Sequence, residues 1–252
     1  MAQDLSEYRA SQREQERIKD LFGLIPESGL LALDIGARDG FLSRQLAQRF
    51  DRVIALDIDQ PNIDHPRIQP VKGDVTHLEF EDATIDLILC AEVLEHIPPA
   101  LLDAACKEIA RVACGTVVIG VPYKQDLRCG ETTCYTCGKP NPPWGHVNSF
   151  DEQRFSELFP GLQLIKYAYV GSVFECTNSF SAALLRYAGN PYGTYMQDEP
   201  CIHCGATLKK PPARHLAQKV ATRIAFWANA LQAIFGCPKA NWIHAQFKRV
   251  SN

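Results

Sequence analysis

The 252-residue sequence lacks any apolar run long enough to span a bilayer. Its longest mostly apolar stretch, at residues 224–237, is shorter than the roughly 20 residues of a spanning helix and is interrupted by Asn229 and Gln232. The first 20 residues are polar and charged and lack the apolar core of a secretion signal. These absences exclude the usual transmembrane and secreted classes, so we expect a cytoplasmic protein.

Acidic residues are missing from the last part of the chain. Residues 200–252 contain no Asp or Glu but eight Lys and Arg, although the whole chain has a formal net charge of -3. A basic segment is therefore carried by an acidic body.

The spacing of apolar residues predicts an α/β fold. Five apolar runs alternate with helical patterns, and runs that are apolar on both faces indicate a parallel sheet covered by helices on both sides. The predicted strands are LLALDI (30–35), RVIALDI (52–58), IQPV (68–71), TIDLILC (84–90) and GTVVIGV (115–121). The predicted helices are 4–22, FLSRQLAQRF (41–50) and PALLDAACKEIARV (99–112).

The later part of the chain predicts a sheet interrupted by insertions. A helix in 149–159 and strands at 162–170 and 241–250 continue the core, whereas segments rich in Pro, Gly and Cys are irregular. We expect the following parts: a core at 1–121, a first insertion at 122–149, a core helix and strand at 150–170, a second insertion with a basic amphipathic helix at 171–238, and a final core strand at 239–252.

The turn after the first predicted strand is LDIGARDG (33–40). Glycines at 36 and 40 permit a sharp turn and close approach of a ligand to the backbone. Asp57 ends the second strand and could accept hydrogen bonds from ribose hydroxyls, and Asp74 follows the third strand, where it could receive an adenine amino group. A dinucleotide enzyme would require GxGxxG, but the chain reads GARDGF, so the pattern describes an adenosine site.

These segments, with IDLILCAEVLEHIP (85–98), resemble the class I S-adenosylmethionine-dependent methyltransferases over residues 5–170 and the final strand. The resemblance implies a Rossmann-like seven-stranded sheet whose last strand is antiparallel. The residues that it implies for cofactor binding are Asp34, Gly36, Ala37, Arg38, Gly40, Asp57, Ile58, Asp74, Val75 and Ala91. Arg38 replaces a usual glycine, and its guanidinium either contacts the cofactor carboxylate or faces solvent.

Methyl transfer to a hydroxyl also requires removal of a proton. His146, in the loop after the fifth strand, and His96, in the LEH segment, are candidate bases, and Glu92 could bind a polar group of the acceptor. A packed, structural role is the alternative for each histidine.

Two copies of C-x-x-C-G, at 134–138 and 201–205, predict a metal site. Each pair of thiolates can hold one side of a zinc ion, so Cys134, Cys137, Cys201 and Cys204 complete a structural four-cysteine site. The alternatives are an iron–sulfur site that includes Cys129, a redox CxxC and disulfides. We expect zinc to join the two insertions over the acceptor pocket, and Cys90, Cys106 and Cys114 to be small core residues.

Residues 214–235 predict a basic helix with an apolar stripe formed by Leu216, Val220, Ile224, Trp227, Leu231 and Phe235. The stripe either packs on its own domain or lies on a membrane surface. The resemblance favours a sugar, glycan or other small metabolite as acceptor, with RNA or protein as the alternative, and the chain shows no aromatic–basic platform for nucleic acid. A non-catalytic scaffold that binds S-adenosylmethionine or zinc is the alternative of another class, and the sequence leaves the oligomeric state open.

Overall fold

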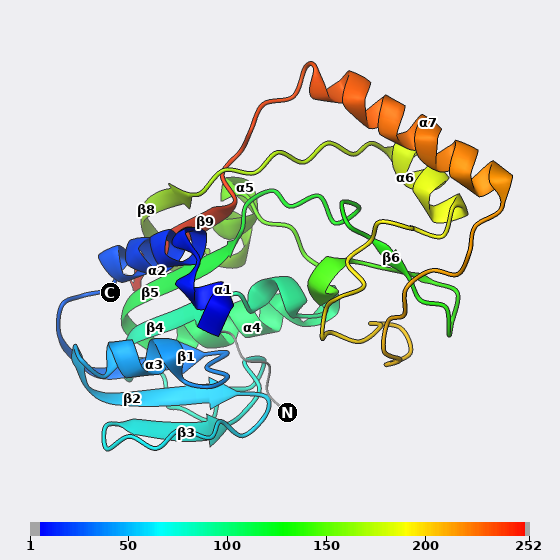
Figure 1. Cartoon of the computed structure of the whole chain (residues 1–252). Coiled ribbons are helices and arrows are strands. Elements are labelled where there is room, and N and C mark those ends of the chain that lie inside the picture. The colour runs from blue at the N-terminus through cyan, green and yellow to red at the C-terminus, as the bar shows by residue number, and fades with distance from the viewer. Residues whose placement is uncertain (1–5, 250–252) are drawn as a thin grey trace. The chain divides into compact units, whose positions relative to one another are not determined.

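The computed structural model describes residues 6–249 (Figure 1). Its internal contacts divide the chain into two compact units. Unit 1 consists of Met1–Tyr123, Phe150–Gly171 and Ala240–Asn252, and unit 2 of Lys124–Ser149 and Ser172–Lys239. Each unit is described below by itself.

Unit 1 is built on a seven-stranded sheet in the order β3-β2-β1-β4-β5-β9-β8 (Figure 1). The first five strands are parallel, and β9 is antiparallel to both of its neighbours. The strands are β1 Gly29–Ile35, β2 Phe50–Asp57, β3 Ile68–Lys72, β4 Ile85–Ala91, β5 Ala113–Pro122, β8 Leu162–Val170 and β9 Trp242–Arg249. The predicted α/β fold with a seven-stranded sheet is therefore confirmed.

Alternate side chains of each central strand enter two separate cores, as the pleat of a strand requires. Leu33 and Ile88 pack with helices α4 and α5 in one core, whereas Ala32 and Leu87 pack with α2 and α3 in the other. This burial on both faces is why the strands read as continuous apolar runs. The helical elements of unit 1 are α1 Ser6–Ala10, α2 Gln12–Leu24, α3 Phe41–Leu46, η1 Leu94–His96, α4 Pro99–Val112 and α5 Glu152–Leu158.

Unit 2 contains a two-stranded hairpin and two longer helices that pack on each other (Figure 1). Its elements are β6 Thr132–Thr133, β7 Pro140–Asn141, η2 Pro143–Gly145, α6 Ser179–Tyr187 and α7 Leu216–Ala233. Helix α6 begins at Asn178, whose side chain accepts a hydrogen bond from the Ser181 amide while the Ser181 hydroxyl accepts one from the Asn178 amide. This reciprocal capping explains why a short helix forms in a segment that the sequence predicts as irregular.

Two predicted helices are corrected in detail. The single helix at 4–22 is two helices, because Ser11 adopts an extended backbone and caps α2 by accepting a hydrogen bond from the Glu14 amide. Helix α2 then runs through Gly23 to Leu24, and residues 4 and 5 lie outside the described part of the chain. The helix predicted at 41–50 ends at Leu46 because the last residue of that segment, Phe50, begins β2.

The chain passes between the two units at one edge of the sheet. Tyr123 follows β5 and is bridged to Phe150, Gly171 follows β8, and Ala240 precedes β9. Because β9 runs antiparallel to β5 and β8, all four crossings occur at the carboxyl end of β5. The chain therefore leaves and re-enters unit 1 at the edge where open parallel sheets bind their ligands.

Candidate functional site

The turn that follows β1 requires its two glycines. Gly36 has φ 78° and Gly40 has φ 77°, a region of backbone conformation that side chains with a Cβ rarely adopt. A Cβ on Gly36 would lie 2.4 Å from a methyl carbon of Val93, and one on Gly40 would lie 2.4 Å from a methyl carbon of Ile63. The glycines thus serve both the conformation of the turn and its packing on neighbouring loops.

Asp57 holds this turn at the end of β2. The Arg38 amide donates to Asp57 Oδ2 at 2.9 Å, and the Asp59 amide donates to Asp57 Oδ1 at 3.2 Å. The amides of Gly36 and Ala37 donate to the Leu56 carbonyl at 2.8 and 3.1 Å. The loop predicted to bind the methionine part of the cofactor and the acid predicted to bind its ribose are therefore in direct contact.

Arg38 keeps the backbone conformation of the glycine that it replaces in the resemblance. Its φ is 47°, in the left-handed region, and the residue is exposed. A non-glycine residue in that region costs about 1–2 kcal/mol. The shape of the turn is therefore retained at the expense of local strain.

Asp34 lies beneath the turn rather than on its surface. Its side chain is buried and its Oδ2 accepts a hydrogen bond from Ser43 Oγ at 2.5 Å. Burial raises the pKa of Asp34 to about 7. We interpret Asp34 as a support for the turn from inside the core.

The other predicted cofactor residues lie where neighbouring parallel strands end. Ile58 follows β2 and is 67% exposed, and Ala91 closes β4. Asp74, after β3, is exposed, and its Oδ1 accepts hydrogen bonds from the amide and the hydroxyl of Thr76, both at 2.8 Å. Val75 is instead buried in the core. The turn and these residues occupy one edge of unit 1.

Two carboxyl groups follow β4, of which Glu92 is partly exposed and Glu95 is buried. Glu92 has φ 57°, lies 3.9 Å from an Arg17 nitrogen, and has a pKa raised by burial despite that cation. Glu95 in η1 is completely buried, and neither of its carboxylate oxygens has a hydrogen-bond partner among the described residues. Burial, together with the nearby Glu92, raises the pKa of Glu95 well above its ordinary value, which favours the neutral acid.

Glu92 was among the predicted site residues, but Glu95 and the buried pair that Arg17 forms with Glu14 at 2.5 Å were not. That pair lies on the helix predicted at 4–22, for which the sequence suggested no buried charge. Its signal was the spacing of Glu14, Arg17 and Leu21, which places charged and apolar side chains on one helix face.

The two candidate histidines belong to different units. His96 ends η1 in unit 1, after Glu95. His146 is buried in unit 2, where its Nδ1 lies 2.6 Å from Gln125 Oε1 and its ring lies 5.9 Å from the Trp144 ring. The hydrogen bond to Nδ1 orients the ring.

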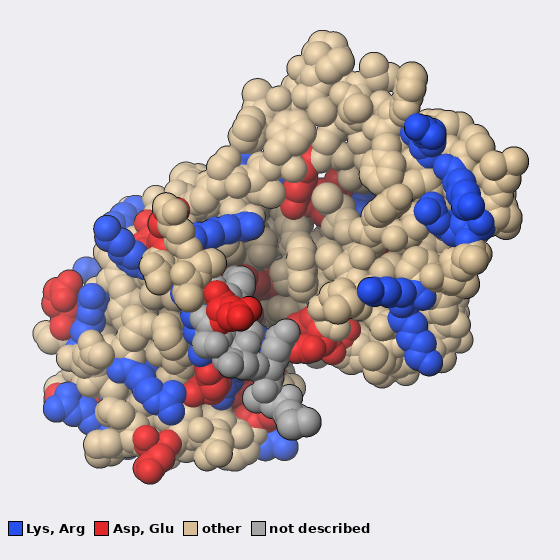
Figure 2. All heavy atoms as spheres, in the orientation of Figure 1, with Lys and Arg blue, Asp and Glu red and all other residues tan. Residues whose placement is uncertain are grey.

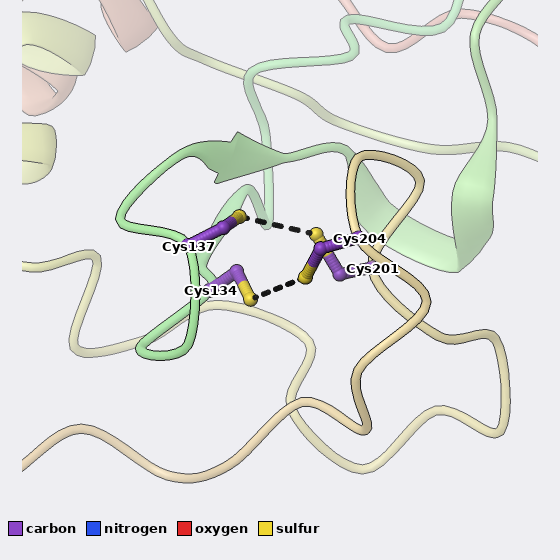
Figure 3. A group of neighbouring side chains, drawn as sticks. All are labelled: Cys134, Cys137, Cys201 and Cys204. Atoms are coloured by element: carbon purple, nitrogen blue, oxygen red, sulfur yellow. Dashed lines mark hydrogen bonds between the residues drawn. The ribbon is translucent and has the colours of Figure 1, made fainter.

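The four cysteines of the two C-x-x-C-G motifs come together in unit 2 (Figure 3). Their sulfurs lie within 4.8 Å of one another, with Cys134 Sγ 3.7 Å from Cys204 Sγ and Cys137 Sγ 3.8 Å from Cys201 Sγ. Zinc–sulfur bonds of about 2.3 Å in a tetrahedron place sulfurs about 3.8 Å apart. The donor set and its spacing fit a zinc ion.

The backbones of the two motifs repeat the same hydrogen bonds. Gly138 N donates to Cys134 O, and Cys134 N donates to Lys139 O; in the second motif Gly205 N donates to Cys201 O, and Cys201 N donates to Ala206 O. Both glycines have positive φ, 74° and 70°. Amides of Cys137 and Thr136 also donate to the Cys134 sulfur and lower the pKa of that thiol to about 6. The two motifs therefore share one backbone fold, and the first also stabilises a thiolate at Cys134.

The remaining cysteines do not join this cluster. Cys129 is not among its members, which argues against the iron–sulfur alternative, and all ten cysteines are free of disulfides. Cys90 and Cys106 are core residues as predicted, but Cys114 is exposed because β5 begins at Ala113 on the rim of the sheet, and its Sγ lies 3.5 Å from Asp86 Oδ1.

Comparison with known proteins agrees with the geometry of unit 1. Residues 33–117 match the model of a family described as "Methyltransferase domain". The matched segment runs from β1 into β5 and contains the glycine turn, Asp57 and Glu92.

Part of the chain is also similar to curated proteins. The Ubiquinone biosynthesis O-methyltransferase of Leptothrix cholodnii is 27% identical over 95 residues, which are 33% of this chain and 40% of that protein. The chain thus matches less than half the length of this relative.

Solved structures resemble the chain over almost its whole length. The N-methyltransferase NodS from Bradyrhizobium japonicum WM9, in complex with S-adenosyl-l-homocysteine, has a TM-score of 0.53 at 15% identity and covers 99% of this chain and 94% of its own. The cyclase SpnF has a TM-score of 0.56 at 13% identity over 96% of this chain and 84% of its own. At this identity the similarity shows the fold alone, and one fold serves different reactions.

Proposed function

We propose that this protein transfers a methyl group from S-adenosylmethionine to a sugar, a glycan or another small metabolite. The observation that carries the proposal is the contact between the Gly36–Gly40 turn and the Asp57 carboxylate at the carboxyl edge of a methyltransferase domain. A tight turn beside a carboxylate that ends the next strand suits a nucleoside whose ribose hydroxyls donate to the acid. Asp74 offers a second carboxylate at the end of β3 for the adenine.

The cofactor supplies a methyl group already activated on a sulfonium. The protein therefore has to bind, orient and exclude water, and alignment of donor and acceptor can contribute several kcal/mol. Asp57 would hold the ribose, the backbone of the turn would hold the methionine part, and Ala91, at the end of β4, would border the reacting methyl.

An acceptor hydroxyl must lose its proton during transfer. His146, His96 and Glu92 are the proposed groups for the base or for acceptor binding. His146 has the best-defined environment of the three, because Gln125 fixes its Nδ1. The curated relative named an O-methyltransferase supports oxygen as the acceptor atom, and nitrogen is the alternative.

One zinc ion bound by Cys134, Cys137, Cys201 and Cys204 would have a structural role, since four thiolates leave no open coordination position. Around these cysteines the buried apolar cluster contains only Tyr195 and Leu208 in addition to two of the ligands. Metal binding would therefore supply stability that so small a core cannot.

The same site would influence which acceptor is methylated. At all four crossings the chain leaves or re-enters unit 1 at the carboxyl end of β5. We propose that the zinc-held insertions shape the acceptor pocket, as loops at this edge do in other α/β enzymes.

A non-catalytic scaffold is the second candidate, and Arg38 is the observation that favours it. In the resemblance a glycine stands at this position, and a bulky side chain there could obstruct the cofactor carboxylate. The retained φ of 47° argues for a working turn instead.

Transfer of radiolabelled methyl groups would test the proposal. The protein is incubated with methyl-labelled S-adenosylmethionine and, separately, with small-molecule, RNA and protein fractions of cells. We expect label in the small-molecule fraction. Label in the RNA or protein fraction would instead identify RNA or protein as the acceptor. No label in any fraction would favour a non-catalytic scaffold.

A further inference from the structure

Helix α7 turns its small and polar side chains toward the rest of unit 2 and its large apolar side chains away from it. Only Ala221, Thr222 and Ala225 of the helix are buried. The predicted apolar stripe is exposed, with Leu216 at 77% and Trp227 at 71%. Packing of this stripe on its own domain, one of the two predicted alternatives, is therefore not what the structure has. The exposed apolar residues of the helix and of the two positions after it are Leu216, Val220, Ile224, Phe226, Trp227, Leu231, Ile234 and Phe235.

Hydrogen bonds from the inner face fix this rotation of the helix. Gln232 Oε1 accepts from Asn178 Nδ2 at 2.9 Å, and Gln218 Nε2 donates to the Tyr187 carbonyl at 3.3 Å. The Asn229 carbonyl also accepts from Cys176 Sγ at 2.9 Å. Turning the stripe inward would break these contacts, so its exposure follows from how the helix is anchored to α6 and its flanks.

Basic side chains lie among the exposed apolar ones. Lys219 and Arg223 are exposed on α7, and at helical spacing Lys219, Arg223 and Trp227 follow one another along the outer surface. Lys209 and Lys210 precede the helix, and no acidic residue occurs after Glu199. Over α7, Figure 2 shows basic and uncharged residues only.

We propose that α7 binds the surface of an anionic lipid bilayer. Long basic side chains can reach lipid phosphates while Trp and Leu enter the boundary between headgroups and acyl chains, where Trp is favoured. The 18 residues of α7 give a contact about 27 Å long. Within residues 6–249 no helix has both the length and the hydropathy to cross a bilayer, so the contact would lie along the surface.

Charge argues against a second copy of the chain as the occupant. Two apposed α7 helices would bring Lys219 and Arg223 of both copies together, and no acidic residue follows Glu199 to pair with them. An anionic lipid surface satisfies both the charges and the apolar stripe, whereas nucleic acid would satisfy only the charges.

Co-sedimentation of the full chain with vesicles tests the proposal. Vesicles of phosphatidylcholine alone are compared with vesicles that also contain phosphatidylglycerol. We expect binding to the anionic vesicles only, weakened by salt, with a blue shift of the tryptophan emission that the Trp227→Phe variant loses. The binding step requires no methyl transfer, so this result is independent of the proposed activity.

Matched variants separate the stripe from general properties of the surface. Arg223→Glu should weaken vesicle binding about tenfold or more, whereas Lys166→Glu, at an exposed lysine of β8, should leave it unchanged. Leu231→Ala combined with Trp227→Ala should weaken binding at least about tenfold, whereas Leu30→Ala, at an exposed leucine of β1, should not. Circular dichroism of each variant checks that it is folded.

Three results would overturn the proposal. The first is equal sedimentation with and without anionic lipid. The second is a concentration-dependent dimer that the Leu231→Ala and Trp227→Ala changes abolish while vesicles bind nothing, which would assign the face to a second copy. The third is retention on RNA with no binding to vesicles, which would assign the basic residues to nucleic acid.

Discussion

Carboxyl groups near the carboxyl edge of the sheet differ in their exposure and hydrogen bonding. Asp57 is partly exposed and accepts hydrogen bonds from two backbone amides, so its carboxylate can meet a ligand. Asp34 and Glu95 are buried, and burial raises the pKa of both. The sequence could not separate these roles, because all of these acids follow or end apolar strands; burial and hydrogen bonding separate them.

Replacement of Asp57 by Asn should weaken binding of S-adenosylhomocysteine about 10- to 100-fold, because hydrogen bonds to a charged acceptor contribute about 1.5–3 kcal/mol. Isothermal titration calorimetry measures the affinity. Asp51→Asn, at the exposed opposite end of β2, is the control and should bind as the unchanged protein does. Equal affinities of the two variants for S-adenosylhomocysteine would contradict a role of Asp57 in cofactor binding.

Replacement of Asp34 by Asn should change how stability depends on pH. The pKa of Asp34 is raised from 3.8 to about 7, so between these values the native state holds a proton that the unfolded state has released. Stability from this group is therefore present below the ordinary pKa and is lost as pH rises through about 7. As the pH rises from about 4 to about 8, the free energy of unfolding of Asp34→Asn should therefore increase by up to about 4 kcal/mol relative to that of the unchanged protein.

Urea unfolding of both proteins at the two pH values measures this difference. Glu92 and Glu95 titrate in both proteins, so the comparison isolates Asp34. A difference in stability that does not change with pH would show that Asp34 is ionised in the native protein.

Among the elements, strands and helices differed in how much the sequence revealed. β8 was predicted with its exact ends, because it is a nine-residue run between a turn glycine and another glycine. α6 was missed, because its length of nine residues and its Ser-rich start resemble a loop until the capping by Asn178 is seen. For α7 the periodicity predicted the helix, but polar contacts at Gln218 and Gln232 decide which face is exposed, and periodicity does not contain them.

The turn after β1 offers a stability test with a built-in control. Gly36→Ala should destabilise unit 1 by about 2–4 kcal/mol, because an L-residue is strained at φ 78° and its Cβ would overlap Val93. Gly23→Ala, near the end of α2 with no atom within 4 Å of the new Cβ, should stabilise by about 0.5–1 kcal/mol. Thermal unfolding compares the two; a harmless Gly36→Ala would contradict the observed geometry of the turn.

Both cysteine motifs should be required for zinc binding. The combined Cys134→Ser and Cys204→Ser variant should lose the single zinc ion and melt roughly 10 °C lower, since several kcal/mol of metal binding are lost and each moves the Tm by about 2–4 °C. Cys114→Ser, at an exposed cysteine outside the cluster, should keep both zinc and Tm. Elemental analysis of protein purified without chelator, with thermal unfolding, measures both; iron, or no metal in the unchanged protein, would contradict a zinc site.

At the scale of the whole molecule, unit 1 contains the segment that matches the methyltransferase model, and the chain leaves and re-enters unit 1 at one edge of its sheet. The cofactor site of this segment could be predicted from the sequence because the glycine turn, Asp57 and Asp74 lie at the ends of three successive strands. The metal site could be predicted from the spacing of the four cysteines. The burial of Glu95 and Arg17 could not be predicted from the sequence. Only the folded chain shows that α2 buries the ion pair of Glu14 and Arg17 and that the LEH segment buries Glu95.

The central claim is that the carboxyl edge of the sheet binds the adenosine cofactor of methyl transfer. Titration of the unchanged protein with S-adenosylhomocysteine in a calorimeter, with NAD as the comparison, tests it most directly. The account predicts saturable heat for one S-adenosylhomocysteine per chain and none for NAD, because the turn reads GARDGF rather than GxGxxG. No heat with S-adenosylhomocysteine, or equal binding of NAD, would contradict it.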